Sequence, residues 1–115
     1  MKMKTVYTAM PKKIFYHRFS ISKFVLEQGY VPINPFMVFD YYLGEGIDRN
    51  IVRKANNTLV KICEELWVFG DIPNGVEREI EIAEKNKRKI RYFSIDDNAN
   101  IKEIKKEEAK YGEGK

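Results

Sequence analysis

Residues 64–83 read EELWVFGDIPNGVEREIEIA and contain a strand signal, a turn signal and a helix signal in succession. The run from Leu66 to Phe69 is continuously apolar, as expected of a strand that is covered on both faces. A turn rich in Gly, Pro and Asn follows it, and Gly75 opens a segment whose apolar residues recur at helical spacing. This order is typical of a domain in which helices connect the strands of a parallel sheet.

One acid of this helix, Glu79, lies where a solvated acid should not. At about 100° per residue, Val76, Ile80 and Ala83 share one arc of the helix, and Glu79 falls inside that arc. A carboxylate about one turn into the helix, on its sheet-facing side, lies near the edge at which open α/β sheets bind ligands. Glu79 is therefore the candidate for chemistry. The structural alternative is a partly solvated carboxylate that offsets the helix dipole.

The rest of the chain alternates between strands and helices. We predict strands over 5–9, 30–34, 66–69 and 89–94, and helices over 13–28, 48–63 and 75–87. Gly29 is the expected stop of the first helix, and Asp48 is the expected N-cap of the second. This order predicts a three-layer, flavodoxin-like or Rossmann-like α/β domain with a mostly parallel sheet of four to five strands.

The single α/β domain is expected to span residues 1–95. Residues 96–115 are a charged C-terminal tail, in which 101–110 have the pattern of a frayed helix. Residues 35–47 form an aromatic segment with two glycines that is long for a loop in so small a domain, and such loops are often functional. One interpretation of its aromatic side chains is that they form core or dimer contacts, and the other is that they form a lid that stacks on a nucleobase. These residues are Phe36, Phe39, Tyr41 and Tyr42.

Length and composition describe one globular domain. The 115 residues are 43% hydrophobic and 13% aromatic, and the net charge is +4. No run approaches the roughly 18 apolar residues of a membrane helix, and the N-terminus lacks the apolar region of a signal peptide. Cys63 is the single cysteine and forms no intrachain disulfide, which fits a reducing compartment. We therefore expect a cytoplasmic protein with no membrane partner.

Motifs for nucleotide cofactors and metals are missing. The first strand leads into Ala9-Met10-Pro11-Lys12 rather than G-x-G-x-x-G, and no Walker A sequence occurs, which argues against NAD and ATP. His17 has no companion Cys or His residues for a metal site. We expect no cofactor and no metal. The basic residues of 85–91 come without a recognised binding module, which disfavours nucleic acid as a partner but allows a mild attraction for phosphorylated small molecules.

Three stretches together resemble the nucleoside 2-deoxyribosyltransferase-like family, which includes 2'-deoxynucleoside 5'-phosphate N-hydrolases and small uncharacterised relatives. Residues 6–11 (VYTAMP) are similar to the opening strand of the family and its Y-x-x-G-P turn, and residues 63–70 (CEELWVFG) are similar to its central strand. Residues 75–83 (GVEREIEIA) match the G-x-x-x-E-x-x-x-A helix that holds the nucleophilic glutamate. With a last strand at 89–93, the resemblance covers about residues 4–94.

The resemblance implies cleavage or exchange of the N-glycosidic bond of a nucleoside or nucleotide. Glu79 would attack C1' of the deoxyribosyl group and form a covalent glycosyl-enzyme, which water or a second base resolves. Tyr7 would orient or polarise this carboxylate through its hydroxyl, and its structural alternative is a core aromatic. The backbone around Asn74 and Gly75, at a helix N-terminus, would hold a 5'-phosphate. The resemblance also implies a homodimer or a higher homo-oligomer.

The chain departs from the family pattern at three positions. Met10 replaces the glycine that precedes Pro11 in the first turn, and it narrows the space where substrate approaches the backbone. Pro73 replaces a serine before the glutamate helix, so a hydroxyl and an N–H group are both missing there. Asn56 occupies the position at which the family has an aspartate, and that aspartate gives a proton to the departing base.

An asparagine neither gives nor takes a proton as an acid–base group. Asp40 in the aromatic segment and Asp71 after the third strand are the residues that could replace the missing acid. Two alternative functions therefore stay open. One is a non-catalytic nucleotide-binding module of the same fold, and the other is an interaction or nucleic-acid-binding protein that uses the basic residues of 85–91.

Overall fold

A computed structural model describes residues 2–39 and 46–111 of the chain. Coiled elements named η are 3-10 helices. The elements in chain order are β1 (Thr5–Ala9), η1 (Lys12–His17), α1 (Arg18–Glu27), β2 (Val31–Ile33), α2 (Pro35–Val38), α3 (Arg49–Ile62), β3 (Glu65–Phe69), α4 (Asn74–Lys85), β4 (Lys89–Ile95), β5 (Ile101–Ile104) and η3 (Lys106–Glu108).

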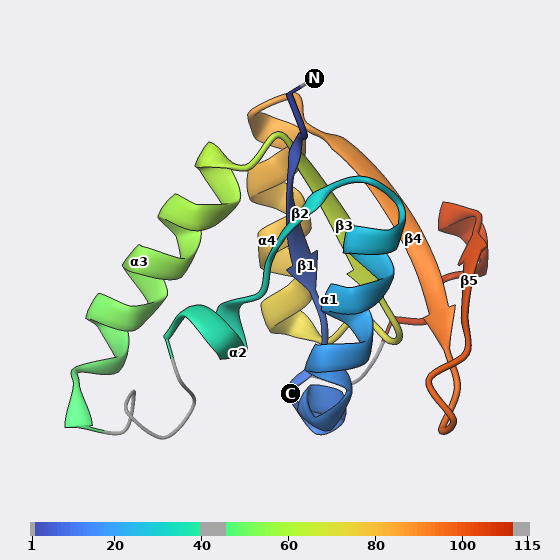
Figure 1. Cartoon of the computed structure of the whole chain (residues 1–115). Coiled ribbons are helices and arrows are strands. Elements are labelled where there is room, and N and C mark those ends of the chain that lie inside the picture. Colours follow the sequence, from blue (N-terminus) through green and yellow to red (C-terminus); the bar gives the residue numbers. More distant parts are fainter. Residues whose placement is uncertain (1, 40–45, 112–115) are drawn as a thin grey trace.

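The five strands form one sheet in the order β2-β1-β3-β4-β5 (Figure 1). The first four strands are parallel, and β5 runs antiparallel to β4. Tyr7 lies in the middle of β1, with Ile33 of β2 on one side and Leu66 of β3 on the other. The predicted mostly parallel α/β sheet is confirmed, with five strands.

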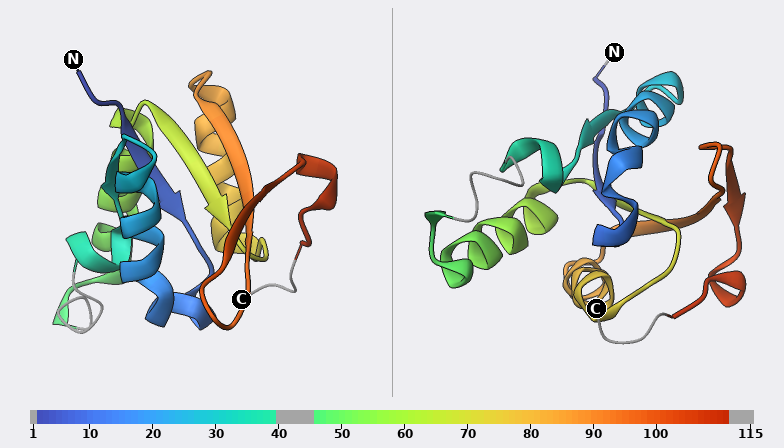
Figure 2. Two further views of the ribbon diagram at one scale, coloured as in Figure 1. Left: turned by 45° about the vertical axis from the view of Figure 1, so that its right-hand side comes forward. Right: turned by 90° about the horizontal axis from the view of Figure 1, so that it is seen from below.

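Helices cover both faces of the sheet, and the right-hand view of Figure 2 shows α1 on one face and α4 on the other. Because successive side chains of a strand point to opposite faces, two separate cores form. On the α1 face, Trp67 and Phe93 pack with Ile21 and Val25 of α1. The second core joins the sheet to α3 and α4 and includes Tyr7, Leu66, Val68, Val60, Val76 and Ile80.

Local sequence signals set the ends of several elements. Gly29 has φ +89° and follows α1, as expected of a helix stop. The side chain of Asp48 accepts a hydrogen bond of 2.8 Å from the Asn50 N–H group, which confirms the predicted N-cap of α3. Gly70 has φ +81°, and a Cβ atom there would lie 3.2 Å from Cδ1 of Ile14. The turn after β3 therefore requires glycine.

The first predicted helix, 13–28, is divided in the structure. Lys12–His17 form the 3-10 helix η1, inside which Ile14 has non-helical dihedral angles, and only Arg18–Glu27 are α-helical. The N–H group of Ile14 donates to the carbonyl of Pro11 over 3.1 Å, so the chain makes a tight turn before the α-helix begins.

The helix predicted over 101–110 is wrong, because Ile101–Ile104 form strand β5. The i, i+3 spacing of the two isoleucines suits a helix, but their backbone pairs with β4, Ile101 with Ile95 and Ile104 with Tyr92. A turn held by the Asp96 carboxylate, which accepts from the Asn100 N–H group over 2.9 Å, reverses the chain. The sheet therefore extends beyond residue 95, where the domain was expected to end.

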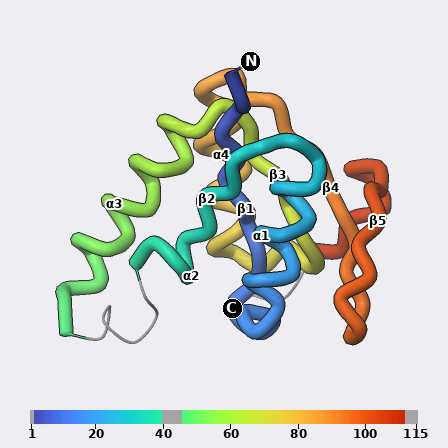
Figure 3. The backbone as a smooth tube through the Cα atoms, in the orientation of Figure 1, coloured from blue at the N-terminus to red at the C-terminus, as the bar shows by residue number. Residues whose placement is uncertain are grey.

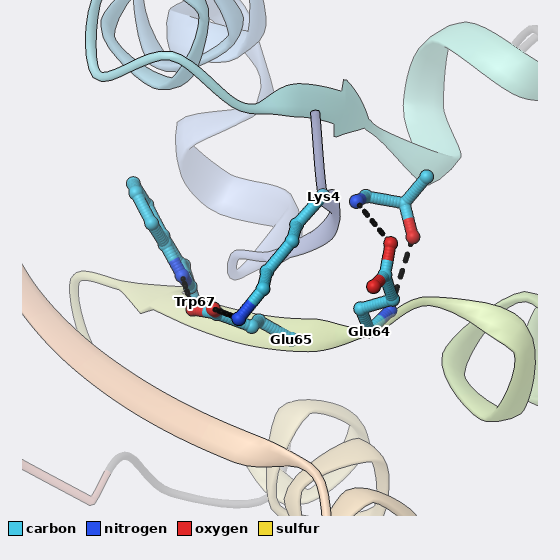
Figure 4. A network of polar contacts seen from close by, with 5 residues as sticks. Lys4, Glu64, Glu65 and Trp67 are labelled. Atoms are coloured by element: carbon cyan, nitrogen blue, oxygen red, sulfur yellow. Dashed lines mark hydrogen bonds and ion pairs between the residues drawn. The ribbon is translucent and has the colours of Figure 1, made fainter. Parts of the chain in front are cut away.

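A buried carboxylate, Glu65, lies at the start of β3. It accepts a hydrogen bond of 2.9 Å from the indole nitrogen of Trp67, and Lys4 lies 3.9 Å from it (Figure 4). Beside it, Glu64 and Thr5 tie the start of β3 to β1 through two backbone-to-side-chain hydrogen bonds. These residues lie at the N-terminal edge of the parallel strands, so they stabilise the edge opposite the one that binds ligands in such folds.

The aromatic segment is described only in part. Its first residues form α2, whose N-cap Asn34 accepts a hydrogen bond of 3.0 Å from the Phe36 N–H group. Phe36 packs against the α1-side core. Asp40, Tyr41 and Tyr42 lie outside the described residues. Figure 3 shows α2 and the start of α3 on the opposite side of the molecule from β5.

Among the described residues, no helix has both the length and the apolar character needed to span a membrane.

Candidate active site

Three polar side chains from three elements meet on the face of the sheet that α3 and α4 cover. Tyr7 comes from β1, Asn56 from α3 and Glu79 from α4. The Tyr7 hydroxyl lies 2.8 Å from Oδ1 of Asn56 and also hydrogen-bonds Oε2 of Glu79. Nδ2 of Asn56 donates to the same oxygen, Oε2 of Glu79, over 2.7 Å. The three groups close a triangle, which we call the polar triangle.

Helical spacing brings Asn56 and Glu79 to this point. Glu79 lies between the buried positions Val76 and Ile80 on α4, so its side chain leaves the helix on the side that packs against the sheet. Asn56 precedes the buried Val60 by one turn of α3 and shares its side of the helix. Tyr7 is fully buried, and its ring belongs to the core beneath the two helices.

Burial controls the charges in the polar triangle. Glu79 and Asn56 are partly exposed, whereas Tyr7 has no exposed surface. Burial raises the pKa of Glu79 from 4.5 to about 7, although the hydrogen bonds from Tyr7 and Asn56 act in the opposite direction. Burial, reinforced by the nearby Glu79, raises the pKa of Tyr7 well above 10. At neutral pH, Tyr7 therefore keeps its proton while Glu79 exchanges between its two forms.

This arrangement suits nucleophilic chemistry. An ionised Glu79 has one oxygen, Oε2, held by two donors, and the residue is partly exposed. A carboxylate held in this way is the group that attacks C1' in retaining glycosyl transfer. Within residues 2–39 and 46–111, no three His, Cys, Asp or Glu side chains are grouped so as to hold a metal ion.

Met10 and Pro11 form the turn after β1, where substrate was expected to approach the backbone. Both residues lie apart from the polar triangle. The Met10 side chain is buried in the core on the α1 face, and its sulfur accepts a hydrogen bond of 3.3 Å from Nδ2 of Asn34. Pro11 is buried and precedes η1 as its N-cap residue. Met10 therefore fills the core on the opposite face of the sheet from Tyr7.

Asp71 and the start of α4 lie on the outside of the molecule. Asp71 forms an ion pair of 2.8 Å with Lys13 of η1. Asn74 and Gly75 are exposed and are the first two residues of α4, after the N-cap Pro73. The first N–H groups of a helix have no partner within it, so this end of α4 presents donors one turn from Glu79. Asp40 lies outside the described residues.

Two features of the structure were missed by sequence reasoning. Asn56 was singled out only as the residue in place of a proton-donating aspartate, and its hydrogen bonds to Tyr7 and Glu79 were not predicted. Its position one turn before Val60, on the apolar side of α3, is the signal that could have shown this. Glu65 was not singled out, and no periodic pattern in the sequence distinguishes it from the adjacent Glu64, which is only partly buried.

Comparisons with known proteins support the fold. A family model described as a domain of unknown function, DUF7768, matches residues 9–93. The solved structure titled 2-desoxiribosyltransferase from Leishmania mexicana is 16% identical, with a TM-score of 0.58, and the alignment covers 86% of this chain and 78% of that chain. An identity of 16% shows a shared fold alone. The resemblance to the deoxyribosyltransferase-like family that the sequence suggested is therefore supported at the level of the fold. No curated protein matches the chain.

Proposed function

The chain belongs to the DUF7768 family, and we propose that it cleaves or exchanges the N-glycosidic bond of nucleosides or nucleotides through a covalent intermediate on Glu79. The observation that carries this proposal is the polar triangle, in which Tyr7 and Asn56 both hydrogen-bond one oxygen of a partly exposed carboxyl. The fold shared with a protein titled 2-desoxiribosyltransferase supports the choice of substrate class.

The proposed reaction has two displacements at C1'. Oε1 of ionised Glu79 forms a bond to C1' as the C1'–N bond breaks, and the departing base keeps the electron pair and gains one proton. Water, or a nitrogen of a second base, then attacks C1', and the C1'–O bond breaks to regenerate the carboxylate. In hydrolysis the attacking water loses one proton. Tyr7 and Asn56 hold Oε2 throughout and orient Oε1.

Other residues take supporting roles in this proposal. The exposed start of α4, at Asn74 and Gly75, holds the 5'-phosphate of a nucleotide. Two residues are candidates for the acid that protonates the departing base. Asp71 is within the part of the chain that the structure describes, and Asp40 lies outside it. The backbone at Met10 and Pro11 lines the approach to the sheet edge. A second copy of the chain completes the site in a homodimer or higher assembly.

The test is base release or base exchange, followed by HPLC, on a panel of 2'-deoxynucleosides and their 5'-monophosphates. Glu79→Gln is compared with the wild type and with Glu81→Gln, which alters an exposed acid of the same helix. We expect activity in the wild type and in Glu81→Gln, and a loss of about a hundredfold or more in Glu79→Gln. Activity that survives in Glu79→Gln would rule out this residue as the nucleophile.

A second candidate is a non-catalytic nucleotide-binding module. It is favoured by Asn56, because an amide stands where the resemblance implies an acid. In that case the folded wild type releases no base from any member of the panel. The same nucleosides and monophosphates would still raise the melting temperature of the protein, because a ligand that binds only the folded state stabilises it.

A further inference from the structure

The polar triangle also indicates where a proton resides. We infer that Tyr7, Asn56 and Glu79 close a hydrogen-bonded ring in the free protein when Glu79 carries a removable proton, with Asn56 as the positioning residue for that carboxyl. The ring is a property of the free protein, and only the consequence for reactivity rests on the proposed function.

A count of hydrogens supports the ring. The triangle has three contacts, between Tyr7 and Asn56, between Asn56 and Glu79, and between Glu79 and Tyr7. Each contact needs one hydrogen between its two heavy atoms. The Tyr7 hydroxyl supplies one, and the Asn56 amide supplies one, because its nitrogen faces one partner and its oxygen faces the other. The third hydrogen has to come from a protonated Glu79.

The count does not depend on how the Asn56 amide is oriented. With Nδ2 toward Glu79, the protonated carboxyl donates to the Tyr7 oxygen, and Tyr7 donates to Oδ1 of Asn56. With the amide reversed, Glu79 donates to Asn56, Asn56 to Tyr7, and Tyr7 to Glu79. In either case an ionised Glu79 leaves two oxygens facing each other with no hydrogen between them, at the 2.8 Å or the 2.7 Å contact.

The surroundings of Glu79 favour the neutral carboxyl. The sheet contributes Tyr7, which is protonated at neutral pH, and α3 contributes the neutral Asn56. Cys63, at the end of α3, acts on the pKa of Tyr7, and burial raises the pKa of its own thiol to about 11. On α4 itself, the neighbouring acids Glu77 and Glu81 are exposed. Among the described residues, no cation contributes to the pKa of Glu79.

The reaction therefore begins with loss of this proton. The neutral carboxyl is no nucleophile, so attack at C1' requires Glu79 to ionise and one contact of the ring to open. Asn56 keeps its donor on Oε2 in the ionised state, together with Tyr7, and so fixes which oxygen stays free to attack. Under the proposed function, kcat/KM rises with pH and levels off above the pH at which Glu79 ionises.

The test is a 13C NMR titration of the glutamate side-chain carboxyls, with the Glu79 signal identified by its absence in Glu79→Gln. We expect a midpoint near pH 7 in the wild type, against 4.5 for an ordinary glutamate. Asn56→Leu removes one donor to the ionised form, and Tyr7→Phe removes the other. Each should move the midpoint upward by about one pH unit or more. If Asn56→Leu does not fold, the Tyr7→Phe variant alone tests the shift of the Glu79 midpoint.

Two outcomes overturn the inference: a wild-type midpoint below about 5, or a midpoint that folded Asn56→Leu and Tyr7→Phe leave unchanged. The titration also separates this inference from the proposed function. A midpoint near 7 without base release keeps the ring and rejects the glycosidic reaction. Base release that depends on Glu79, with a midpoint near that of an ordinary glutamate, keeps the reaction and rejects the ring. Where both hold, Asn56→Leu shifts the kcat/KM profile and the NMR midpoint together.

Discussion

Nδ2 of Asn56 lies 2.7 Å from Oε2 of Glu79, although the two residues are 23 positions apart and belong to different helices. A neutral amide, rather than a cation, is therefore the group that α3 places against this carboxyl. An amide donor weakens the effect of burial without cancelling it. This balance makes the stability of the protein depend on the ionisation of Glu79 and therefore on pH.

Glu79→Gln should stabilise the protein at pH 8 and have little effect at pH 5. The pKa of Glu79 in the folded protein, about 7, lies above its ordinary value of 4.5, so the folded state binds more protons between these values. The contribution of Glu79 to stability is thus greatest at low pH and is lost as pH rises through about 7. The loss above pH 7 is roughly 1–3 kcal/mol, given the partial exposure of Glu79, and a neutral glutamine avoids it.

Thermal unfolding at both pH values measures this effect. We expect Glu79→Gln to melt at least about 4 °C above the wild type at pH 8, with a much smaller difference at pH 5. Glu81→Gln, on the exposed side of α4, should show no such dependence. A Glu79→Gln difference that is equal at the two pH values would contradict the raised pKa.

Gly75→Ala should separate helix stability from phosphate binding. A Cβ atom at Gly75 would meet nothing within 4 Å, and alanine favours the helix over glycine by up to about 1 kcal/mol. The same methyl group would crowd a phosphate bound to the start of α4. We expect an unchanged or higher melting temperature and a several-fold higher KM for 5'-monophosphates, with KM for nucleosides unchanged.

Gly70→Ala is the matched control for this substitution. Gly70 has φ +81°, and its added Cβ would lie 3.2 Å from Ile14, so alanine should destabilise the protein there without discriminating between substrates. If Gly75→Ala raised KM equally for nucleosides and monophosphates, the start of α4 would not be the phosphate site.

Glu65 offers a contrast between a structural carboxylate and the candidate nucleophile. It is 3% exposed and accepts from the Trp67 indole nitrogen over 2.9 Å. Glu65→Ala leaves that buried N–H group without its partner and should cost about 1–3 kcal/mol of unfolding free energy. Base release per folded molecule should change less than twofold, because Glu65 lies at the other edge of the sheet. A large loss of kcat in folded Glu65→Ala would contradict this assignment.

Local signals were enough to predict most of the fold. The continuous apolar run of β3 predicts a strand covered on both faces, and all five of its residues are buried. Gly29 and Asp48 mark helix ends through backbone conformation and side-chain capping, which depend on only a few neighbouring residues. The helical period likewise predicted the sheet-facing direction of Glu79, because the period is a property of one helix.

Contacts between distant elements were beyond local signals. The role of Asn56 depends on how α3 packs against α4 and β1, and a single sequence carries no record of that packing. The isoleucines of β5 have a spacing that a helix also satisfies, and only pairing with β4 decides between the two. The short helix η1 likewise depends on the turn after β1, where Ile14 also packs near Gly70.

Asn56→Asp should make the stability of the protein more sensitive to pH. The substitution places a second carboxyl at the 2.7 Å contact with Glu79, and two carboxylates so close do not both ionise readily. The pair shares one proton, so its higher apparent pKa should exceed the value of about 7 for Glu79 alone. The folded state then holds its proton to higher pH, and ionising the pair costs more.

Melting temperatures of Asn56→Asp and the wild type at pH 5 and pH 8 test this expectation. At pH 8 the variant should lose at least about 1 kcal/mol relative to the wild type, with a smaller loss at pH 5 where the shared proton is bound. Asn57→Asp, one position along the same helix, controls for an added charge on α3. Equal losses for Asn56→Asp at both pH values would mean that the new carboxyl turns away from Glu79, and that the contact between α3 and α4 is not held as the polar triangle requires.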